Sequence, residues 1–305
     1  EIEKFILDNK DDNFVIIATY NSSHKISSSI KKKKFKFDLA IFDEAHRTVG
    51  TKNKLFSKLL YEKNINIEKR LFMTATKRLV KNFKDIIDMS DEKIYGKVAH
   101  EMSFKQAIES KEKILSDYNF ISKGIDKEEI YSLWKQNPNV RHLDLDETNM
   151  KYMSSLILMF KTIKKYNLKK GISFHNSINS AKNFKIIAET YQKYLNPKND
   201  IQLFHISSRN NSSGDKYSII KDFENDKKSI ITNARGLVEG VDVPAVDFVI
   251  FVDKKRSRTD IIQAIGRCLR LSNNKKFGYV IVPFIFDKRI KRDDFLKTEY
   301  ADVRS

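Results

Sequence analysis

The stretch Leu39-Ala40-Ile41-Phe42-Asp43-Glu44-Ala45-His46 decides the fold class of this chain. Its apolar part, predicted as a strand over Leu39–Asp43, is short and bounded by polar residues, which is typical of a buried parallel strand. In an open parallel sheet, ligands bind beyond the carboxyl ends of the strands. We therefore expect Asp43 and Glu44 to face a ligand. An acidic loop is the alternative for Asp-Glu alone, but Asp-Glu-Ala-His after an apolar strand is more specific.

Short apolar runs of this kind alternate with helical stretches along the whole chain. The alternation predicts a doubly wound α/β architecture in two copies. The predicted strands are Phe14–Thr19, Leu39–Asp43, Leu71–Thr74, Gly171–His175, Ile201–His205, Ser229–Thr232, Phe248–Val252 and Tyr279–Pro283, with one more near Tyr118–Ser122. The predicted helices are Lys54–Glu62, Ile178–Leu195, Tyr217–Glu224 and Arg258–Leu269.

The stretch 104–150 is more polar and less periodic than the rest, and we interpret it as the join between two domains. We expect the C-terminal part of a first domain over 1–108. A second domain would follow over 109–290, with a polar insertion near 123–150, and 291–305 would begin a further segment or tail. The N-terminus carries neither a signal sequence nor an initiator Met, so we expect the chain to be a piece of a longer protein.

The charge balance is strongly basic. Among 305 residues, Lys+Arg 58 against Asp+Glu 40 gives a net charge of +18, which favours an anionic partner and most simply nucleic acid. A lysine bias of the whole proteome is the alternative. The single cysteine, Cys268, excludes an internal disulfide and a cysteine metal cluster. We expect no membrane span and an intracellular setting, cytoplasmic or, for a eukaryotic or viral protein, nuclear or in the virion.

A second informative stretch, Gln263-Ala264-Ile265-Gly266-Arg267-Cys268-Leu269-Arg270, lies on a predicted helix. Positions 263, 266, 267 and 270 share one helix face, so the two arginines project together at a shared anion. Gly266 would let a neighbour pack closely against that face. A nucleoside triphosphate with its metal needs carboxylates for the metal and water, and arginines for the phosphate charge. A solvated basic face is the alternative.

Two further segments indicate a function less strongly than these two stretches. Thr74-Ala75-Thr76 follows a predicted strand, where its hydroxyls could relay hydrogen bonds or Thr76 could begin a helix. Residues 232–244 contain Gly236 and Gly240, which permit close backbone approach, and Asp242, which could accept a hydrogen bond from a ribose hydroxyl. A plain connection that contains glycine is the alternative for this segment.

Taken together, these segments resemble motifs II, III, V and VI of superfamily 2 helicases in order and character. Ile172–Ser177 looks like motif IV, and Ile17–Ser22 looks like the Thr-Tyr-Gln-Ser stretch that precedes motif II. The chain is most similar to predicted DEAD/DEAH-box helicases related to the translocase subunits of type I and type III restriction enzymes. The shared segments are Asp43–Arg47, Tyr95-Gly96 with Ser103-Phe104, and Glu239–Pro244.

The resemblance implies two RecA-like domains, the first incomplete at its N-terminus, with ATP and Mg²⁺ in the cleft between them and nucleic acid, DNA rather than RNA, across the top. Arg267 and Arg270 would point toward Asp43 and Glu44. The implied roles are Asp43 for Mg²⁺, Glu44 for the hydrolytic water, Arg267 and Arg270 for the phosphates, Gly240 and Asp242 for the nucleotide, His46, Thr74, Thr76 and Gln263 for coupling, and Thr19, Ser177 and Thr232 for the nucleic-acid backbone.

One departure from the family is serious. The printed sequence has no Gly-x-x-x-x-Gly-Lys-Ser/Thr loop, and its one Gly-Lys pair, Gly96-Lys97, is followed by Val98. We expect that loop upstream in a parent protein, and little ATP hydrolysis by this piece alone. Any nuclease or methyltransferase module would lie elsewhere in the parent. A nucleic-acid-binding module that lost the loop is the alternative, and the sequence upstream of Glu1 would distinguish the two.

Overall fold

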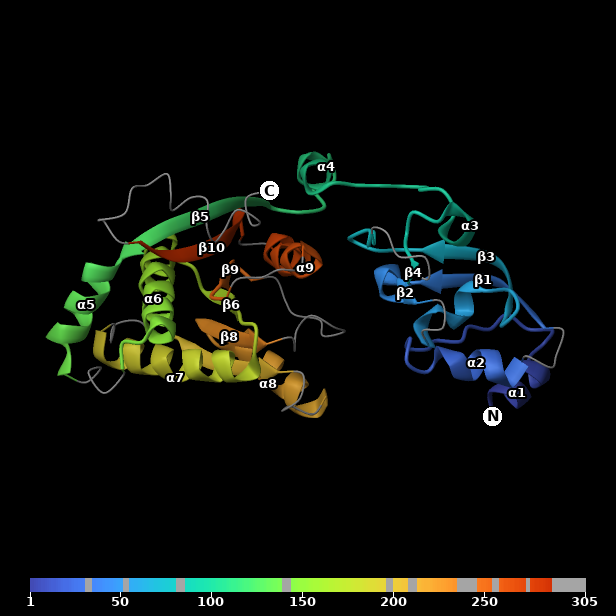
Figure 1. Ribbon diagram of the computed structural model, residues 1–305, viewed down its shortest axis with the longest axis horizontal. Coiled ribbons are helices and arrows are strands. Elements are labelled where there is room, and N and C mark those ends of the chain that lie inside the picture. Colours follow the sequence, from blue (N-terminus) through green and yellow to red (C-terminus); the bar gives the residue numbers. More distant parts are fainter. Residues whose placement is uncertain are drawn as a thin grey trace. The chain divides into compact units, whose positions relative to one another are not determined.

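The computed structural model describes residues 1–30, 35–51, 55–80, 86–138, 144–195, 200–207, 213–234, 246–253, 258–272 and 275–286. It divides into two compact units, residues 1–101 and 102–305 (Figure 1). The division falls a few residues before the boundary expected after residue 108, so that helix α4 (Phe104–Glu109) lies in the second unit. The expected tail, 291–305, lies outside the described residues.

The first unit is built on two parallel strands, β1 (Lys36–Phe42) and β3 (Asn66–Phe72), with Phe42 opposite Phe72. These strands correspond to the ones predicted at Leu39–Asp43 and Leu71–Thr74. A small antiparallel pair joins β2 (Gly50–Thr51) to β4 (Ile86–Ile87). The helical segments of this unit are α1 (Ile2–Asp8), α2 (Ser23–Ile30), η1 (Ala45–Thr48), η2 (Leu55–Leu60) and α3 (Glu92–Tyr95).

Two predictions for the first unit were wrong. Residues 14–19 are not a strand, and the helix predicted over Lys54–Glu62 is a shorter 3-10 turn, η2. Phe14 and Ile16 pack into an apolar cluster, whereas Val15 and Ile17 are 82% and 93% exposed. The alternation typical of a strand is therefore present, but no described strand pairs with residues 14–19, and strand identity depends on that pairing.

The sheet of the first unit is covered unequally. Phe42 and Phe72 stack on one face, with ring centroids 4.8 Å apart, and belong to a buried cluster. On the other face, Leu39, Ile41 and Leu71 remain 53%, 58% and 43% exposed. Apolar side chains of this size contribute to stability mainly when they are removed from water. The first unit therefore gains less from its strands than a sheet that is covered on both faces.

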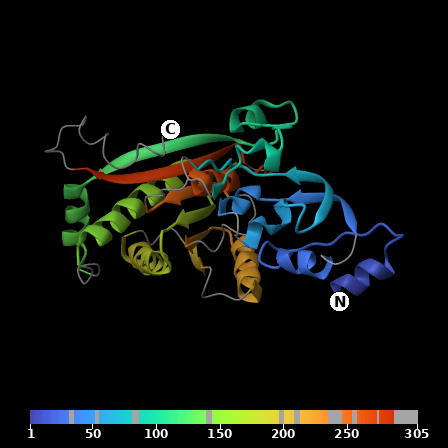
Figure 2. The ribbon, with the colours of Figure 1, turned by 45° about the vertical axis from the view of Figure 1, so that its right-hand side comes forward.

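The second unit is a parallel α/β layer structure. Its described residues include six parallel strands in the order β5-β10-β9-β6-β8-β7, and the long strands β5 and β10 run side by side (Figure 2). The strands are β5 (Asp117–Asp126), β6 (Lys170–Phe174), β7 (Gln202–Ser207), β8 (Ser229–Ala234), β9 (Phe248–Phe251) and β10 (Phe277–Phe286). The further helices are α5 (Lys127–Gln136), α6 (Glu147–Tyr166), α7 (Ile178–Leu195), α8 (Ser213–Asn225) and α9 (Arg258–Leu269). The α/β class and the strands predicted for this half are confirmed.

The stretch 123–150, where a polar insertion was expected, holds the end of β5, all of α5 and the start of α6. Aspartates begin both helices, because Asp126 accepts a hydrogen bond from the amide of Glu128 and Asp146 accepts one from the amide of Asn149. Every residue of α6 from Leu156 to Phe160 is buried. The middle of α6 is therefore buried on every side, whereas both of its ends carry exposed charged residues.

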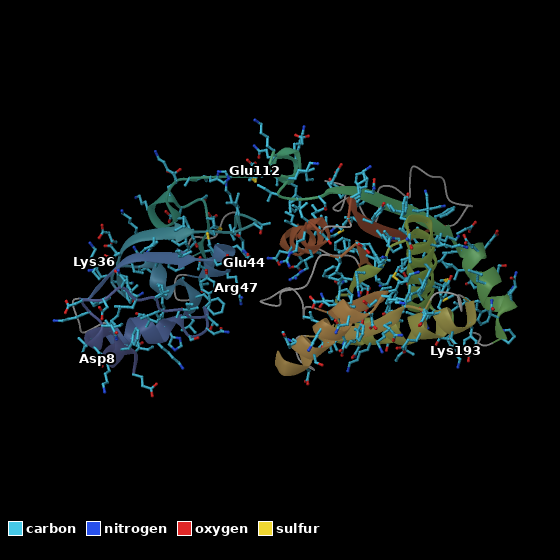
Figure 3. The ribbon with its side chains drawn as sticks, turned by 180° about the vertical axis from the view of Figure 1, so that it is seen from behind. Asp8, Lys36, Glu44, Arg47, Glu112 and Lys193 are labelled. Atoms are coloured by element: carbon cyan, nitrogen blue, oxygen red, sulfur yellow. The ribbon has the colours of Figure 1, made fainter. Side chains whose placement is uncertain are left out.

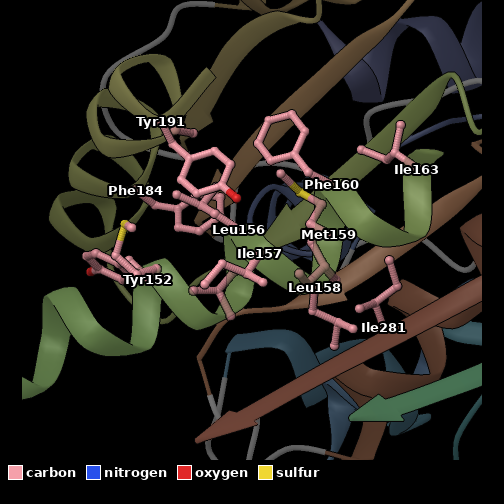
Figure 4. Close-up of a cluster of buried hydrophobic side chains, with 14 of the residues drawn as sticks. Tyr152, Leu156, Ile157, Leu158, Met159, Phe160, Ile163, Phe184, Tyr191 and Ile281 are labelled. Carbon is pink, nitrogen blue, oxygen red and sulfur yellow. The ribbon is translucent and has the colours of Figure 1, made fainter. Parts of the chain in front are cut away.

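Apolar layers cover both faces of the second sheet. Phe248 and Ile250 of β9 belong to a cluster with residues of α5, α6 and α7, whereas Val249 and Phe251 belong to a cluster with residues of α8 and α9. Figure 4 shows the first cluster, in which side chains of α6 pack against Phe184 and Tyr191 of α7 and Ile281 of β10. This alternation is the period of two expected for strands that are buried on both faces.

Two lysines of the second unit bind helix ends. The ammonium of Lys170 donates to the carbonyls of Phe223, Glu224 and Asp226 at the end of α8 and to the Ser229 hydroxyl. The ammonium of Lys275 donates to the carbonyls of Val246, Cys268 and Arg270, the last two at the end of α9. Burial lowers the pKa of both lysines. Cations at these positions satisfy carbonyls that have no partner within the helix.

None of the described helices combines the length and the apolar character needed to cross a lipid bilayer.

Candidate functional site

The two carboxylates lie where β1 ends. Asp43 follows the strand directly, and Glu44 adopts the left-handed backbone conformation, with φ 49° and ψ 46°. Parallel pairing continues past the strands, because the Met73 amide donates to the Phe42 carbonyl at 2.9 Å and the Ala45 amide donates to the Met73 carbonyl at 2.9 Å. The residues that follow β1 and β3 are thus fixed side by side at the carboxyl edge, as the sequence predicted.

His46 and Thr74 connect these two loops. His46 Nδ1 lies 3.0 Å from Thr74 Oγ1 and 3.3 Å from Glu44 Oε2. The Thr74 hydroxyl donates its one hydrogen to the Thr76 carbonyl and accepts from the Thr76 amide, so it can only accept from His46. His46 Nδ1 therefore carries a proton, which it donates to the Thr74 hydroxyl, and the Glu44 carboxylate lies within ion-pair distance of the same nitrogen.

The environment keeps Glu44 ionised. The adjacent His46 imidazole lowers the pKa of the Glu44 carboxyl, and the positive charge of nearby Arg47 lowers it further, against the opposing effect of partial burial. Figure 3 shows Glu44 and Arg47 close together at this edge. At neutral pH the Glu44 side chain is a carboxylate, which accepts hydrogen bonds and so can orient a water molecule.

Asp43 is exposed, and one of its carboxylate oxygens accepts a hydrogen bond from the Glu44 amide at 2.9 Å. Among the described residues, no group of three or more His, Cys, Asp or Glu side chains could hold a metal ion. A metal at Asp43 would take its other ligands from water or a bound phosphate. This donor set fits Mg²⁺, which usually keeps several waters and binds proteins through one or two carboxylates.

A turn ahead of α2 reaches the same loop. Thr19 and Ser22 form an exposed hydroxyl pair, with their oxygens 2.7 Å apart, and the Thr19 carbonyl accepts from the amides of Ser22 and Ser23. Between them, the Tyr20 hydroxyl donates to the Asp43 carbonyl at 2.7 Å. The sequence treated Tyr20 only as part of a resemblance and gave no role to its side chain.

The segment expected to contact nucleic acid in the second unit follows β6. Ser177 is exposed, and its hydroxyl accepts a hydrogen bond from the Ser180 amide at 3.0 Å at the start of α7. Asp253, just beyond β9, is buried and accepts from Lys151 Nζ, from the Ser180 hydroxyl at 2.6 Å and from the Asn176 amide at 2.9 Å. Burial raises the pKa of Asp253, but these hydrogen bonds outweigh it and leave the pKa below its ordinary value. No sequence motif indicated Asp253.

Thr232 lies within β8 and is fully buried. Its hydroxyl donates to the Phe204 carbonyl at 3.2 Å and accepts from His205 Nδ1 at 3.0 Å. Burial lowers the pKa of His205, and the charges of two lysines add to this effect. The nucleic-acid contact expected for Thr232 stays a prediction, and it would require this hydroxyl to become accessible.

The arginine motif lies on α9 and just beyond it. Gln263 and Arg267 are partly buried on the helix, whereas Arg270 is exposed one residue after the helix ends. A Cβ atom added at Gly266 would meet nothing within 4 Å, so the close neighbour predicted for Gly266 is not a described residue. Gly240 and Asp242 lie outside the described residues. The direction in which Arg267 and Arg270 project stays a prediction.

Two known protein families match parts of the chain. The helicase conserved C-terminal domain matches residues 150–272, and the type III restriction enzyme, res subunit, matches residues 2–79. The first match lies in the second unit and the second match lies in the first unit. The resemblance to superfamily 2 helicases, on the side of the restriction-enzyme translocases, is therefore confirmed.

Individual relatives agree with this assignment. The putative helicase 22 of Sulfolobus islandicus filamentous virus (isolate Iceland/Hveragerdi) is 26% identical over 302 residues, which are 94% of this chain and 51% of that protein. The probable helicase A859L of African swine fever virus (isolate Pig/Kenya/KEN-50/1950) is 27% identical over 278 residues, 88% of this chain and 28% of that protein.

Among solved structures, the ATP-dependent Type ISP restriction-modification enzyme LlaBIII bound to DNA matches with a TM-score of 0.73 and 27% identity, over 95% of this chain and 21% of that one. The chain thus spans about half of the first viral relative and less of the other two proteins.

Proposed function

We propose that the chain is part of an ATP-dependent translocase or helicase that moves along nucleic acid, DNA rather than RNA. The observation that carries the proposal is the cluster at one sheet edge in which His46 contacts both the Glu44 carboxylate and the Thr74 hydroxyl beside Asp43. A carboxylate for a metal beside a second carboxylate for water is an arrangement suited to phosphoryl transfer to water. A net charge of +18 and the DNA bound to LlaBIII support DNA as the track.

In this proposal each residue has one task. Asp43 binds Mg²⁺, which when bound neutralises charge on the phosphates. Glu44 orients the attacking water as a hydrogen-bond acceptor, and His46 holds the Glu44 carboxylate in place from the side of Thr74. Arg267 and Arg270 bind phosphate oxygens, for which the planar guanidinium is well suited.

The remaining expected residues stay part of the proposal with less support. Thr76 fixes the Thr74 hydroxyl, and Gln263 lies one turn before Arg267 on α9. Thr19 and Ser177 present exposed hydroxyls to a nucleic-acid backbone. Because the printed sequence contains no Gly-x-x-x-x-Gly-Lys-Ser/Thr loop, we propose that hydrolysis requires a protein that also supplies this loop, and that the 305 residues alone turn over ATP poorly.

ATP turnover by the protein that contains this chain tests the proposal, with duplex DNA, single-stranded RNA and no nucleic acid compared at equal nucleotide concentration. We expect the largest rate with DNA, and displacement of a bound third strand as the protein moves along the duplex. Equal rates under all three conditions would contradict a nucleic-acid motor.

The second candidate function is a nucleic-acid-binding module that does not hydrolyse ATP. It differs from the first candidate in whether the protein that contains this chain has a phosphate-binding loop. Tight DNA binding together with undetectable turnover by the whole protein would select this alternative.

A further inference from the structure

Tyr20 joins two functional segments of the first unit through a single side chain. Its backbone belongs to the exposed turn of Thr19 and Ser22, where the Tyr20 carbonyl also accepts from the Ser23 hydroxyl at 3.0 Å. Its hydroxyl donates to the Asp43 carbonyl at 2.7 Å. The side chain is therefore fixed at both ends, by the turn that is expected to contact nucleic acid and by the peptide that joins the two carboxylates.

The Tyr20 hydroxyl is a dependable donor. Burial raises the pKa of Tyr20 to about 12, and the negative charge of Asp43 adds to the effect. The hydroxyl consequently keeps its proton at any pH near neutrality, and the hydrogen bond to the Asp43 carbonyl persists. The ring is held as well, because the Arg47 guanidinium lies 5.9 Å from the Tyr20 ring centre and 5.5 Å from that of Phe56.

The Asp43–Glu44 peptide is the sensitive end of this connection. Glu44 has a left-handed backbone, which costs a residue with a Cβ free energy unless its surroundings hold it there. The restraints on this bend include the Tyr20 hydroxyl, the Asp43 carboxylate and the backbone bond from Ala45 to Met73. A shift of Tyr20 would rotate the peptide bond between Asp43 and Glu44, whose side chains are proposed to bind the metal and the water.

We propose that Tyr20 is a positioning residue that transmits nucleic-acid contact at the Thr19–Ser22 turn to the Asp43–Glu44 peptide, an inference that rests on the proposed function. Nucleic acid that engages the two exposed hydroxyls displaces the turn, and the Tyr20 hydroxyl carries that displacement to the Asp43 carbonyl. The result is a rate of ATP turnover that responds to nucleic acid.

The test needs a variant that removes the hydrogen bond and keeps the packing. Tyr20→Phe does so, because only the hydroxyl oxygen is lost. Tyr61→Phe is the matched control, because Tyr61 packs against the same apolar cluster and its buried hydroxyl has no hydrogen-bond partner among the described residues. Any effect of trimming a tyrosine in this core appears in both variants, whereas loss of the connection to Asp43 appears only in Tyr20→Phe.

The first measurement is ATP turnover by the protein that contains this chain, with and without duplex DNA, together with its Kd for DNA. We expect Tyr20→Phe to lower the stimulation by DNA about fivefold, the factor that one hydrogen bond provides, with a Kd within about twofold of the parent value. Tyr61→Phe should retain full stimulation. Unchanged stimulation in Tyr20→Phe, or equal losses with and without DNA, would overturn the proposal.

The second measurement separates this proposal from the proposed function. Hydrogen exchange at the amides of Glu44 and Ala45 is followed in the 305-residue chain, with and without a DNA oligonucleotide. We expect the oligonucleotide to change the exchange of these amides in the parent and in Tyr61→Phe, but not in Tyr20→Phe. If turnover is absent and this pattern is present, the motor function fails and the connection stands. If the oligonucleotide leaves these amides unaffected in the parent, the connection itself is wrong.

Discussion

Glu44 combines an uncommon backbone conformation with a carboxylate that lies within ion-pair distance of His46. In the protein that contains this chain, Glu44→Gln should leave ATP binding largely intact and lower turnover by about two orders of magnitude or more, because the shape is kept and the acceptor for water is lost. The measurement is steady-state turnover beside the Kd for ATP. Glu68→Gln on β3, which removes an exposed carboxylate paired with Lys36, is the control. Turnover within about twofold of the parent would show that Glu44 does not have the role proposed for it.

His46 should set the pH range in which Glu44 works. The pKa of Glu44 lies below its ordinary value of 4.5, mainly because the His46 imidazole lies beside the carboxylate. In His46→Ala the donor is gone while the burial remains, so the pKa rises and the acidic limb of the turnover profile moves to higher pH. His100→Ala, at an exposed histidine of the same unit, should leave the acidic limb in place.

The lowered pKa of Glu44 in the parent protein also affects the free energy of unfolding. A carboxyl whose pKa is lower in the folded state stabilises that state above its unfolded pKa. This contribution is present above about pH 4.5 and is lost as the pH falls through the lowered pKa. Urea unfolding of His46→Ala should therefore show a smaller loss of stability between neutral pH and pH 4 than the parent shows, and an identical loss would contradict the bond between His46 and Glu44.

At the scale of single residues, sequence reasoning placed Asp43, Glu44, His46 and Thr74 at one sheet edge, because residues that follow parallel strands must meet there. It gave no role to the Tyr20 hydroxyl and did not find Asp253. Tyr20 bonds to Asp43, which is 23 residues away in the sequence, and Asp253 bonds to Ser180, which is 73 residues away. Such hydrogen bonds depend on how the helices and strands pack together, and a local pattern of apolar residues does not indicate them.

Helix α9 offers a test at the scale of elements. A methyl group at Gly266 would meet open space, so Gly266→Ala should raise the free energy of unfolding of the second unit by about 0.5–1 kcal/mol through helix propensity alone. If a nucleotide approaches this face of α9, the same variant should lower turnover. The two measurements are urea unfolding of the chain and ATP turnover of the whole protein. Higher stability with full turnover would show that nothing approaches Gly266.

Gly278 on β10 is the matched glycine with the opposite expectation. A Cβ atom there would lie 2.4 Å from the carbonyl oxygen of Cys268 and 2.7 Å from its sulfur. Gly278→Ala should therefore lower the free energy of unfolding by about 1–3 kcal/mol, because α9 would have to move away from the sheet.

The helices that the sequence predicted well, Ile178–Leu195 and Arg258–Leu269, have one apolar face each, and the structure gives them the same bounds. The sequence did not reveal α6, whose middle is buried on every side. It also predicted a strand at Phe14–Thr19, where alternation is present but no described strand lies alongside to pair with it. The spacing of apolar residues in a sequence indicates which side chains are buried. Whether a segment forms a strand also depends on a second strand that pairs with it.

For the molecule as a whole, the basic charge predicts binding to nucleic acid without sequence preference. Between about 50 and 200 mM salt, the affinity of the chain for an oligonucleotide should fall by roughly two orders of magnitude if about four phosphates are contacted. A peptide nucleic acid of the same base sequence, which carries no phosphates, is the control and should bind weakly at every salt concentration. Affinity that does not respond to salt would leave a lysine-rich proteome as the explanation of the charge.

Lys170 and Lys275 are two lysines that we expect evolution to retain even if other lysines of the chain are replaced by arginine. A surface lysine that only supplies charge can be exchanged for arginine as the base composition of a genome changes. Each of these two ammonium groups instead serves three carbonyls around one point, and the larger planar guanidinium cannot match that geometry. Descendants of this gene in a genome richer in G and C should lose many of their lysines and retain these two.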